Sequence, residues 1–542
     1  MGNCVSRSQQ PFTASCSSSA EKNLGNGILD GLPIAEPTTS FWTIPAAPVA
    51  THQSQENLPS HADVVIIGSG ISGASFARTL LEHGNSLHVV MLEAQDACSG
   101  ATGRNGGHIF AATYHDYEYL KKRVSEDMAK KMMRFRKAHL DEILAVAAEE
   151  GITEYTQCRA VEGVDVYFDK PTFREAQRKL QVYQRDMGEY AGSYTCYEGL
   201  SAQEKYHLSP LAVGCIATRA GAIHPYRFVT SILSRLLTDY PKEFELHTRA
   251  PCTSIDEPTS SRPFYKLTTA RGVITTPHIV HLTNAYAPAL LPSLKGAIYP
   301  IRETMTAQRP GRNLHASTLH GRRSFVFFDS PRKGFDYLTQ LPEGEHELMF
   351  GAGFESRTDG GADGMYGVHS AAHVGGAMPI YFGAESWGAE ALPTTPADEK
   401  DVGVGSWAEG RVKAIWSGLL SESADGMPWV GQVHVNVAGR KAPPASSAPS
   451  ALIDPRSNTE KPKSVATAAP GEWIAAGYSG EGMVHAWLSS KAVALMLLGE
   501  DLTEVKTWLP ELFSVTEERV KMAKRTFKPD VVLSGKRRVF SL

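Results

Sequence analysis

The stretch DVVIIGSGISGASF, Asp63 to Phe76, decides how this chain begins to fold. Its first part, DVVIIG, is a continuous apolar run of the kind found in strands that are buried on both faces of a parallel sheet. A glycine-rich turn follows at once, and the residues after it have the pattern of a helix that runs to about Gly84. A second apolar strand, LHVVMLE, ends at Glu93. The order strand, turn, helix, strand predicts a β-α-β unit of a parallel sheet.

The turn of this unit, GSGISG, has the spacing G-x-G-x-x-G. In this spacing Gly68 permits the tight turn, Gly70 lets a pyrophosphate approach the main chain, and Gly73 lets helix and strand pack closely. The pyrophosphate would lie at the helix N-terminus, and Glu93 would accept hydrogen bonds from a ribose. A purely structural glycine turn is the alternative, which the strand, the helix and the acid together disfavour. The predicted dinucleotide-binding residues of this unit are Gly68, Gly70, Ile71, Ser72, Gly73, Glu93 and Ala94.

The amino-acid composition is typical of a globular protein without a strong net charge. It has 542 residues, with 54 Lys and Arg against 58 Asp and Glu, so no global field would draw in nucleic acid. No apolar run is long enough for a transmembrane helix, and no secretory signal is evident. Seven scattered cysteines predict free thiols in a reducing compartment such as the cytoplasm, and no paired His or Cys spacing suggests a metal.

The N-terminal segment, residues 1–61, is rich in Ser, Thr, Pro, Gln and Asn and is expected to be mostly disordered. Its start, MGNCVSRS, fits a myristoylation motif with Gly2 as acceptor, and Cys4 beside it is a palmitoylation candidate. Two acyl chains would anchor the chain to a membrane where one would not, and a chance match is the alternative. Within PTTSFWTIP, Phe41 and Trp42 are expected to dock on the folded body, because water is a costly environment for them.

Beyond the first unit, the pattern predicts further helices and a second sheet. Residues 115–150 predict one or two helices, and RFVTSILSRLLTDY, from Arg227, predicts an amphipathic helix. Apolar, alternating segments from FELHTRA at Phe244 to HELMFGAGF at Phe354 suit a largely antiparallel sheet. Residues 436–470 are a Pro/Ser/Ala/Lys tract that predicts a low-complexity surface insertion.

A second glycine-rich segment follows the first unit directly, in EAQDACSGATGRNGGHI, Glu93 to Ile109. Here the sequence resembles the FAD-dependent oxidoreductases of the D-amino-acid oxidase/glycine oxidase superfamily, and most of all their ATGRNGG branch of gamma-glutamylputrescine oxidase-type and fungal enzymes. The likeness runs from about Ser40 to Glu500 and implies FAD, not NAD, as the cofactor. It also implies that this segment passes along the pyrophosphate and flavin; a solvated surface charge is the alternative for Arg104. The residues concerned are Thr102, Gly103, Arg104, Asn105, Gly106 and Gly107.

Three later segments match the same family. HTRAPCTSID resembles its adenine-contacting strand, IVHLTNAYAPALLP its return to the dinucleotide domain, and AAGYSGEGM its C-terminal flavin loop. In the last of these, a helix N-terminus would face the flavin N1–C2=O edge and stabilise the negative charge of the reduced ring. The residues that the resemblance places at the cofactor are Cys252, Thr283, Asn284, Ala285, Gly477, Gly480, Gly482 and Met483.

Departures from the family pattern limit the substrate. Relatives that hold flavin covalently use a cysteine in the stretch that reads IWSGLLSESADGMPWVG here, so the resemblance implies non-covalent FAD. Relatives that oxidise amino acids carry an arginine near Leu420, where this chain has Leu419, Leu420 and Ser421. An arginine there would hold a carboxylate bidentately, so an amine is the expected substrate unless another loop supplies a cation. Arg302 is expected to be structural.

The resemblance implies oxidation of a C–N bond with hydride transfer to flavin N5 and reoxidation by O₂. His108 and Tyr478 are the catalytic candidates, with Glu481 a further candidate for lining the pocket; an unperturbed His108 would titrate near neutral pH. Trp416 and Trp429 are expected in the core. A dehydrogenase with another electron acceptor, and a lipid-anchored FAD-binding regulator without turnover, remain alternatives.

The expected fold is α/β: a Rossmann-like FAD-binding domain with a second α+β substrate domain on a mainly antiparallel sheet. The expected boundaries are 62–115, 215–290 and 410–500 for the FAD domain, 116–214 and 291–409 for the substrate domain, and 501–542 for a C-terminal extension.

Overall fold

The computed structural model describes residues 31–34, 36–83, 86–111, 113–314, 319–329, 334–352, 363–390, 407–445 and 467–526. The acylation candidates Gly2 and Cys4, most of the expected insertion at 436–470 and the end of the C-terminal extension lie outside these residues. No helix in the described part of the chain is both long and apolar enough to cross a membrane.

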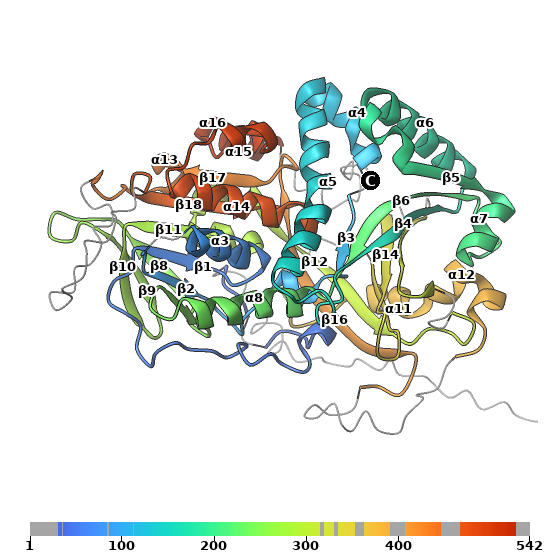
Figure 1. The fold of residues 1–542 in the computed structure, drawn as a ribbon, viewed down its shortest axis with the longest axis horizontal. Helices are drawn as coiled ribbons and strands as arrows, with labels where there is room; N and C mark the ends of the chain where they lie inside the picture. The colour runs from blue at the N-terminus through green and yellow to red at the C-terminus, as the bar shows by residue number, and fades with distance from the viewer. Residues whose placement is uncertain are drawn as a thin grey trace, which may run out of the picture.

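The first sheet, on the left in Figure 1, is mainly parallel and has the strand order β17-β18-β11-β1-β2-β7. Every neighbouring pair is parallel except β17 with β18. The bounds are β1 (Val64–Ile67), β2 (Val89–Leu92), β7 (Phe244–His247), β11 (His278–His281), β17 (Trp429–Val433) and β18 (Gly471–Ala476).

Both faces of this sheet are covered, which explains why its strands are apolar throughout. Val64 and Ile66 of β1 pack toward α3 (Ile71–Glu82), α8 (Pro225–Asp239) and α14 (Ala486–Leu497). Val65 and Ile67 share a core with an antiparallel sheet on the other face. Its strands are β8 (Cys252–Asp256), β9 (Tyr265–Thr269) and β10 (Gly272–Thr276).

The second sheet has the order β16-β12-β15-β14-β13-β4-β6-β3, with β5 beside β6. Its pairs are antiparallel except β13 with β4, so the predicted fold, a parallel sheet plus a mainly antiparallel one, is confirmed. The bounds are β3 (His108–Ile109), β4 (Arg159–Tyr167), β5 (Tyr194–Glu198), β6 (Gly214–Ala222), β12 (Ile298–Gln308), β13 (Arg323–Asp329), β14 (Gly334–Gln340), β15 (Leu348–Ala352) and β16 (Val412–Ser423).

Several strands belong to a different sheet from the one expected. β7 and β11 were grouped with the antiparallel segments, but both are parallel strands of the first sheet. Conversely, β3, β6 and β16 lie within ranges assigned to the FAD domain, yet they pair in the second sheet. Apolar alternation shows that a segment is a strand, but the partner strand is set by long-range pairing that alternation does not encode.

Helices cover the remaining surfaces. The predicted helical region 115–150 contains two helices, α4 and α5, and the predicted amphipathic helix is α8. The longer helices not yet given are α4 (Thr113–Arg123), α5 (Glu126–Glu149), α6 (Lys170–Asp186), α7 (Gly199–Tyr206), α11 (Val368–Gly376), α12 (Met378–Trp387), α15 (Thr503–Trp508) and α16 (Glu517–Thr526). The short ones are η1 (Phe41–Thr43), η2 (Ala101–Arg104), η3 (Gly188–Ser193), η4 (Asn284–Tyr286), α9 (Ala287–Leu290), η5 (Pro292–Leu294), α13 (Val435–Ala438), η9 (Gly482–Val484) and η10 (Glu511–Phe513).

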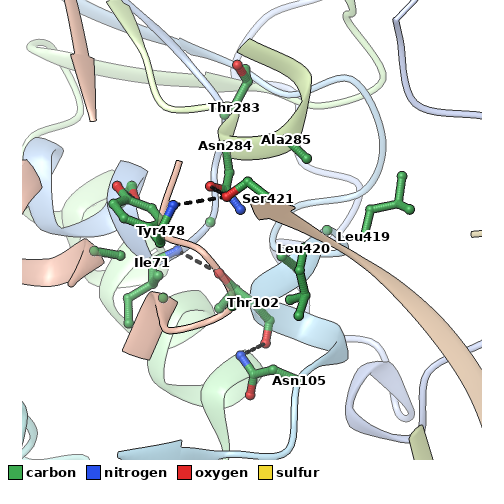
Figure 2. Close-up of a pocket in the computed structure, with 18 of the residues that line it drawn as sticks. Ile71, Thr102, Asn105, Thr283, Asn284, Ala285, Leu419, Leu420, Ser421 and Tyr478 are labelled. Carbon is green, nitrogen blue, oxygen red and sulfur yellow. Dashed lines mark hydrogen bonds between the residues drawn. The ribbon is translucent and has the colours of Figure 1, made fainter. Parts of the chain in front are cut away.

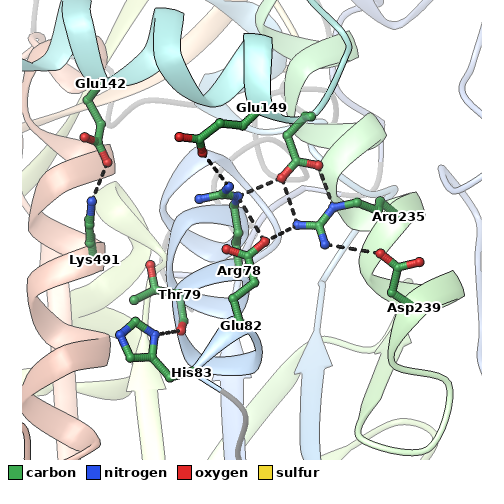
Figure 3. A network of polar contacts seen from close by, with 10 residues as sticks. Arg78, Thr79, Glu82, His83, Glu142, Glu149, Arg235, Asp239 and Lys491 are labelled. Carbon is green, nitrogen blue, oxygen red and sulfur yellow. Dashed lines mark hydrogen bonds and ion pairs between the residues drawn. The ribbon is translucent and has the colours of Figure 1, made fainter.

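Helix α5 stands between the two halves of the molecule in Figure 1, and its C-terminal end is tied to the first half by ion pairs. Glu150 lies 2.7 Å from Arg78 of α3 and 2.5 Å from Arg235 of α8. Arg78 also pairs with Glu149, and Arg235 with Glu82 (Figure 3). These contacts fix the helix that carries Arg136 toward the site described next.

The segment before β1 packs on the body, as predicted for PTTSFWTIP. Trp42 in η1 is 1% exposed and stands edge-on to the His224 ring. Phe41 is partly buried and lies 5.2 Å from the Trp407 ring. Trp416 and Trp429 are fully buried, so their expected place in the core is confirmed.

Candidate active site

A cavity runs from the carboxyl ends of the parallel strands to the inner face of the second sheet. Figure 2 shows part of it, with side chains from α3, the loop before β3, η4, β16 and the loop after β18 converging on one space. Of the predicted cofactor residues, those that line the cavity are Gly68, Gly70, Ile71, Ser72, Glu93, Ala94, Thr102, Asn105, Gly106, Cys252, Thr283, Asn284, Ala285, Gly480, Gly482 and Met483.

The first turn requires glycine for steric reasons. Gly68 has φ +110°, and a Cβ there would lie 2.7 Å from the Leu282 carbonyl oxygen. Gly73 does not line the cavity, but a Cβ on it would meet the Gly68 carbonyl oxygen at 2.2 Å. Its predicted role, close packing of helix on strand, therefore has a direct geometric cause. The N-terminus of α3 lines the cavity, and one of its N–H groups, that of Ile71, donates to Thr102 Oγ1 at 3.0 Å.

Glu93 follows β2 at the edge of the cavity. Its Oε2 accepts hydrogen bonds from the N–H and the hydroxyl of Ser69, at 3.0 and 2.7 Å, and its Oε1 accepts one from the Gln95 N–H. The carboxylate is thus held against the first glycine turn, and its neighbour Ala94 lines the same wall.

The segment Ser99–Gly107 places only part of its residues on the cavity. Gly103, Arg104 and Gly107 do not line it. Arg104 is 4% exposed and donates to the carbonyls of Ser99 and Ser417, at 2.7 and 2.8 Å. Burial lowers the pKa of its guanidinium, with Asp363 nearby opposing that shift. The alternative of a solvated surface charge is therefore wrong, and the side chain acts behind the loop instead.

Three distant segments are joined at the middle of the cavity. Asn284 Oδ1 accepts from the Ser421 hydroxyl at 2.5 Å and from the Gly477 N–H at 3.1 Å. Ser421 Oγ in turn accepts from the Tyr478 N–H at 3.0 Å (Figure 2). Gly477 lies behind the cavity wall, against Trp429, whereas Gly480 lies on the wall.

The far end of the cavity carries ionisable side chains from several elements. Arg136 of α5 donates to Asp116 of α4 at 2.7 Å and lies 2.8 Å from Glu481 of the loop after β18. Asp116 is 3% exposed, and its other oxygen, Oδ1, has no hydrogen-bond partner among the described residues. Burial raises the pKa of Glu481 to about 7, against the opposing effect of Arg136. Glu422 lines the cavity close enough to act on Glu481, and Glu303 lines it beside Tyr337.

The catalytic candidate His108 lies on the cavity wall beside Tyr337, with the two ring centres 5.2 Å apart. Its Nε2 is buried and has no hydrogen-bond partner among the described residues. Burial lowers its pKa to about 4, so the ring is neutral at physiological pH, unlike an unperturbed histidine, which would titrate near neutrality. The neighbouring Tyr337 hydroxyl donates to Glu303 at 3.0 Å.

The other candidate, Tyr478, lines the cavity with its ring, but its hydroxyl is tied to the protein. It donates to the Ala475 carbonyl and lies 2.8 Å from Ser72 Oγ. Burial raises its pKa above the usual range. This geometry favours packing of the flavin loop over proton transfer.

Of the residues at this acidic end, the sequence predicts only Glu481. Asp116 and Arg136 lie twenty residues apart on helices that showed only a charged, amphipathic pattern. Glu303 and Glu422 stand on neighbouring strands whose alternation marks them as strands but not as cavity walls. A charged residue within an otherwise buried strand or helix face is a signal that could have pointed to them.

The residues present fit an FAD. The fixed glycine turn, the N-terminus of α3 and the carboxylate of Glu93 form one wall of a continuous cavity. Such a helix N-terminus suits a pyrophosphate, and an acid at the end of the second strand suits a ribose. At Gly106, a Cβ would lie 2.8 Å from both Tyr337 and His108, so a larger residue would displace these two side chains of the cavity wall.

Comparisons with known proteins agree with this fit. The family model described as FAD dependent oxidoreductase, DAO, matches residues 63–496. The probable oxidoreductase OrdL of Haemophilus influenzae is 25% identical over 257 residues, which span 46% of this chain and 56% of that protein. This chain thus matches little more than half the length of its curated relative.

Solved structures share the fold at low identity. Glycine oxidase from Geobacillus kaustophilus aligns with a TM-score of 0.57 at 15% identity, covering 85% of this chain and 99% of that one. L-proline dehydrogenase from P. horikoshii aligns with a TM-score of 0.56 at 16% identity, covering 85% and 100%. Iminodiacetate oxidase from Chelativorans sp. BNC1 aligns with a TM-score of 0.54 at 15% identity, covering 81% and 98%.

Proposed function

This chain belongs to the DAO family of FAD-dependent oxidoreductases, and we propose that its substrate is an amine and not a free α-amino acid. We place it nearest the gamma-glutamylputrescine oxidase-like branch, on the ATGRNGG segment around Arg104. When bound, FAD supplies a ring that accepts a hydride from a carbon next to nitrogen, which leaves an imine that water hydrolyses to a carbonyl product.

One observation carries the proposal: the far end of the cavity is lined by carboxylates. The acids there are Asp116, Glu481 and, close to Glu481, Glu422; a fourth acid, Glu303, lines the cavity beside Tyr337. Arg136 is the one guanidinium among the described lining residues, and two of these acids already engage it. A substrate ammonium would find complementary charge at this end, whereas a substrate carboxylate would meet like charge.

The position near Leu420 supports the same choice. The side chains of Leu419 and Leu420 line the cavity, and Ser421 is occupied by its bonds to Asn284 and Tyr478. No cation stands on this stretch of β16 to hold a carboxylate in a bidentate pair. The apolar leucines would instead contact the carbon chain of an amine.

Different residues of the chain would act at the two ends of the cavity. The N–H groups at the start of α3 and the carboxylate of Glu93 would bind the pyrophosphate and ribose. The acidic end would orient the amine, and the neutral His108 and the aromatic ring of Tyr337 would exclude water beside it.

We also propose that FAD is bound without a covalent link and that O₂ reoxidises it. No cysteine follows Cys252 in the chain, so the C-terminal third offers no thiol for a flavin bond. Acid precipitation should then release all of the flavin into the supernatant. Retention of yellow colour in the washed pellet would contradict the non-covalent assignment.

The test of the amine assignment is anaerobic bleaching of the 450 nm flavin band against a panel of amines, amino acids and amino sugars. We expect at least one amine to bleach the flavin and free α-amino acids to leave it oxidised. Hydrogen peroxide formed after admission of air would identify O₂ as acceptor, whereas its absence after bleaching would favour a dehydrogenase. Protein that binds FAD but is bleached by nothing on the panel would favour a regulator without turnover.

A further inference from the structure

Three successive carbonyls of the segment Ser99–Gly107 each accept a hydrogen bond from a side chain outside that segment. The bonds run from Ser40 Oγ to Gly103 O at 2.6 Å, from Trp416 Nε1 to Arg104 O at 2.9 Å, and from Trp42 Nε1 to Asn105 O at 2.5 Å. A buried carbonyl is costly to leave without a partner, so these donors hold the peptide planes of the loop in one orientation.

Two of the three donors belong to the segment of residues 36–45, which precedes the first strand and is here called the strap. The strap is itself fastened to the second sheet through Thr38. The Ser417 N–H donates to Thr38 Oγ1 at 3.0 Å, and Arg104 Nη1 donates to the same oxygen at 3.2 Å. The Thr38 N–H donates to the Asp363 carbonyl at 2.8 Å. The strap thus connects the glycine loop to β16.

The orientation of these carbonyls determines where the following N–H groups point. In a planar trans peptide the C=O and the next N–H point in opposite directions. The carbonyls held by the strap therefore turn the N–H groups of Arg104 and Gly106 away from it, and the bond from Trp416 turns the Asn105 N–H away from β16. Ser40 and Trp42 do not line the cavity, whereas Asn105 and Gly106 do, so the N–H groups are turned toward the cavity side of the loop.

We propose that the strap is part of the cofactor site and that Ser40 and Trp42 are positioning residues for FAD. Neither side chain would touch the cofactor; each would act by presenting loop N–H groups to it in advance of binding. A loop with four glycines would otherwise lose much conformational freedom on binding, and this cost would weaken affinity. Upstream of the strap, Leu32 and Pro33 line the cavity directly, which extends the contribution of this segment to the site.

The experiment uses the full chain with single substitutions that each remove one donor; the volume lost in Trp42→Phe is matched by the control given below. Trp42→Phe removes the indole N–H, and Ser40→Ala removes one oxygen. The apo-protein of each variant is titrated with FAD, and the Kd is read from flavin fluorescence. We expect the Kd to rise about tenfold in each variant, the scale of one lost hydrogen bond to a buried partner. The Tm of each apo-protein is measured alongside.

The matched control is Trp473→Phe. Trp473 is 3% exposed, and its Nε1 donates to His278 Nδ1 near the start of the parallel strands, away from the loop. This control should lower the Tm of the apo-protein while leaving the Kd for FAD within twofold of the wild type. A Kd that stays unchanged in Ser40→Ala and Trp42→Phe, or that rises equally in Trp473→Phe, would overturn the proposal. If Trp42→Phe does not fold, Ser40→Ala decides the question alone. The titration needs no substrate, so its result is independent of the amine assignment.

Discussion

The two ends of the cavity are made of different parts of the chain. The cofactor end consists largely of main chain: the turn at Gly68, the N-terminus of α3 and the loop Ser99–Gly107. The far end consists of side chains, among them Asp116, Arg136 and Glu481, from separate elements. Main-chain turns follow from local sequence, whereas a cluster of side chains depends on how distant elements pack. The comparison therefore separates what FAD binding requires from what substrate choice requires.

The largest expected effect is at the cofactor end, in Gly73→Ala. A Cβ at this position would lie 2.2 Å from the Gly68 carbonyl oxygen, which is main chain and has no rotamer to escape into. The helix would have to move off the turn, at a cost of about 1–3 kcal/mol in folding free energy, as for overpacked cores. We expect loss of FAD from the purified protein, measured as the ratio of absorbance at 450 and 280 nm.

Gly375→Ala is the control for this change. Gly375 lies in α11, and a Cβ there meets nothing within 4 Å, so alanine should keep or slightly raise the Tm and leave FAD bound. Retention of a full complement of FAD by Gly73→Ala would show that the turn tolerates a Cβ at this position, contrary to its geometry.

This contrast also explains how much of the structure could be predicted from the sequence. The turn, the first strand and the helix α3 lie within twenty consecutive residues, and each has its own local signal. The fold class followed from that unit together with the alternating strands. The strand order could not be predicted from the sequence. Strands of four residues, such as β7 and β11, carry no sequence signal that identifies the strand they pair with.

The residues of the far end were harder to predict from the sequence, for a physical reason. Asp116, Arg136 and Glu481 meet only after α4, α5 and the flavin loop have packed together. In the sequence each is one charged residue among many, and most charged residues lie on solvated faces. His108 teaches the same lesson, since its position on the cavity could be predicted from the sequence but the burial that lowers its pKa could not.

The second prediction tests the independence of the two ends with Asp116→Asn. The change removes a buried negative charge but keeps the shape, and Arg136 keeps its pair with Glu481. We expect KM for the amine to rise about tenfold, on the scale of one lost charge-assisted bond, with the Kd for FAD unchanged. Steady-state kinetics and an FAD titration measure the two quantities.

Glu118→Gln is the matched control, two residues along the same helix. Glu118 pairs with Lys122 and Arg178 on the outside of the molecule, so its neutralisation should change neither quantity. A loss of FAD affinity in Asp116→Asn would mean that the two ends are coupled.

The third prediction concerns pH and Glu481. Because its pKa in the folded protein is raised to about 7 from an ordinary value of 4.5, the folded state holds a proton that the unfolded state releases between these values. Its contribution to stability is therefore present below about pH 4.5 and is lost as the pH rises to about 7, by at most about 1.4 kcal/mol for each pH unit. In Glu481→Gln this loss should be absent, as measured by urea unfolding at pH 5 and pH 7.5.

The same ionisation should appear in catalysis. As Glu481 loses its proton near pH 7, the far end becomes more negative and should bind a cationic amine more tightly, lowering KM about threefold as the pH rises. Glu481→Gln should lose this limb of the profile and keep any limb that belongs to the substrate amine. An identical pH profile in the two proteins would remove Glu481 from the substrate site.

The smallest expected effect lies outside the cavity, at the ion pairs of Figure 3. Arg235→Gln removes one of two guanidinium groups at Glu150, but Arg78 remains 2.7 Å from that buried carboxylate. We expect a loss of about 1 kcal/mol in unfolding free energy, reduced in 1 M salt, since part of the network faces solvent. The pair of the exposed Arg185 with Asp186 gives the baseline, and Arg185→Gln should cost less. Helix α5 also carries Arg136 into the far end, so Arg235→Gln tests whether the ion pairs position that end. A rise in KM for the amine with an unchanged Kd for FAD would show that they position the side chains of the far end only. Unchanged values of both would confine the ion pairs to stability, and weakened FAD binding would contradict the separation of the two ends.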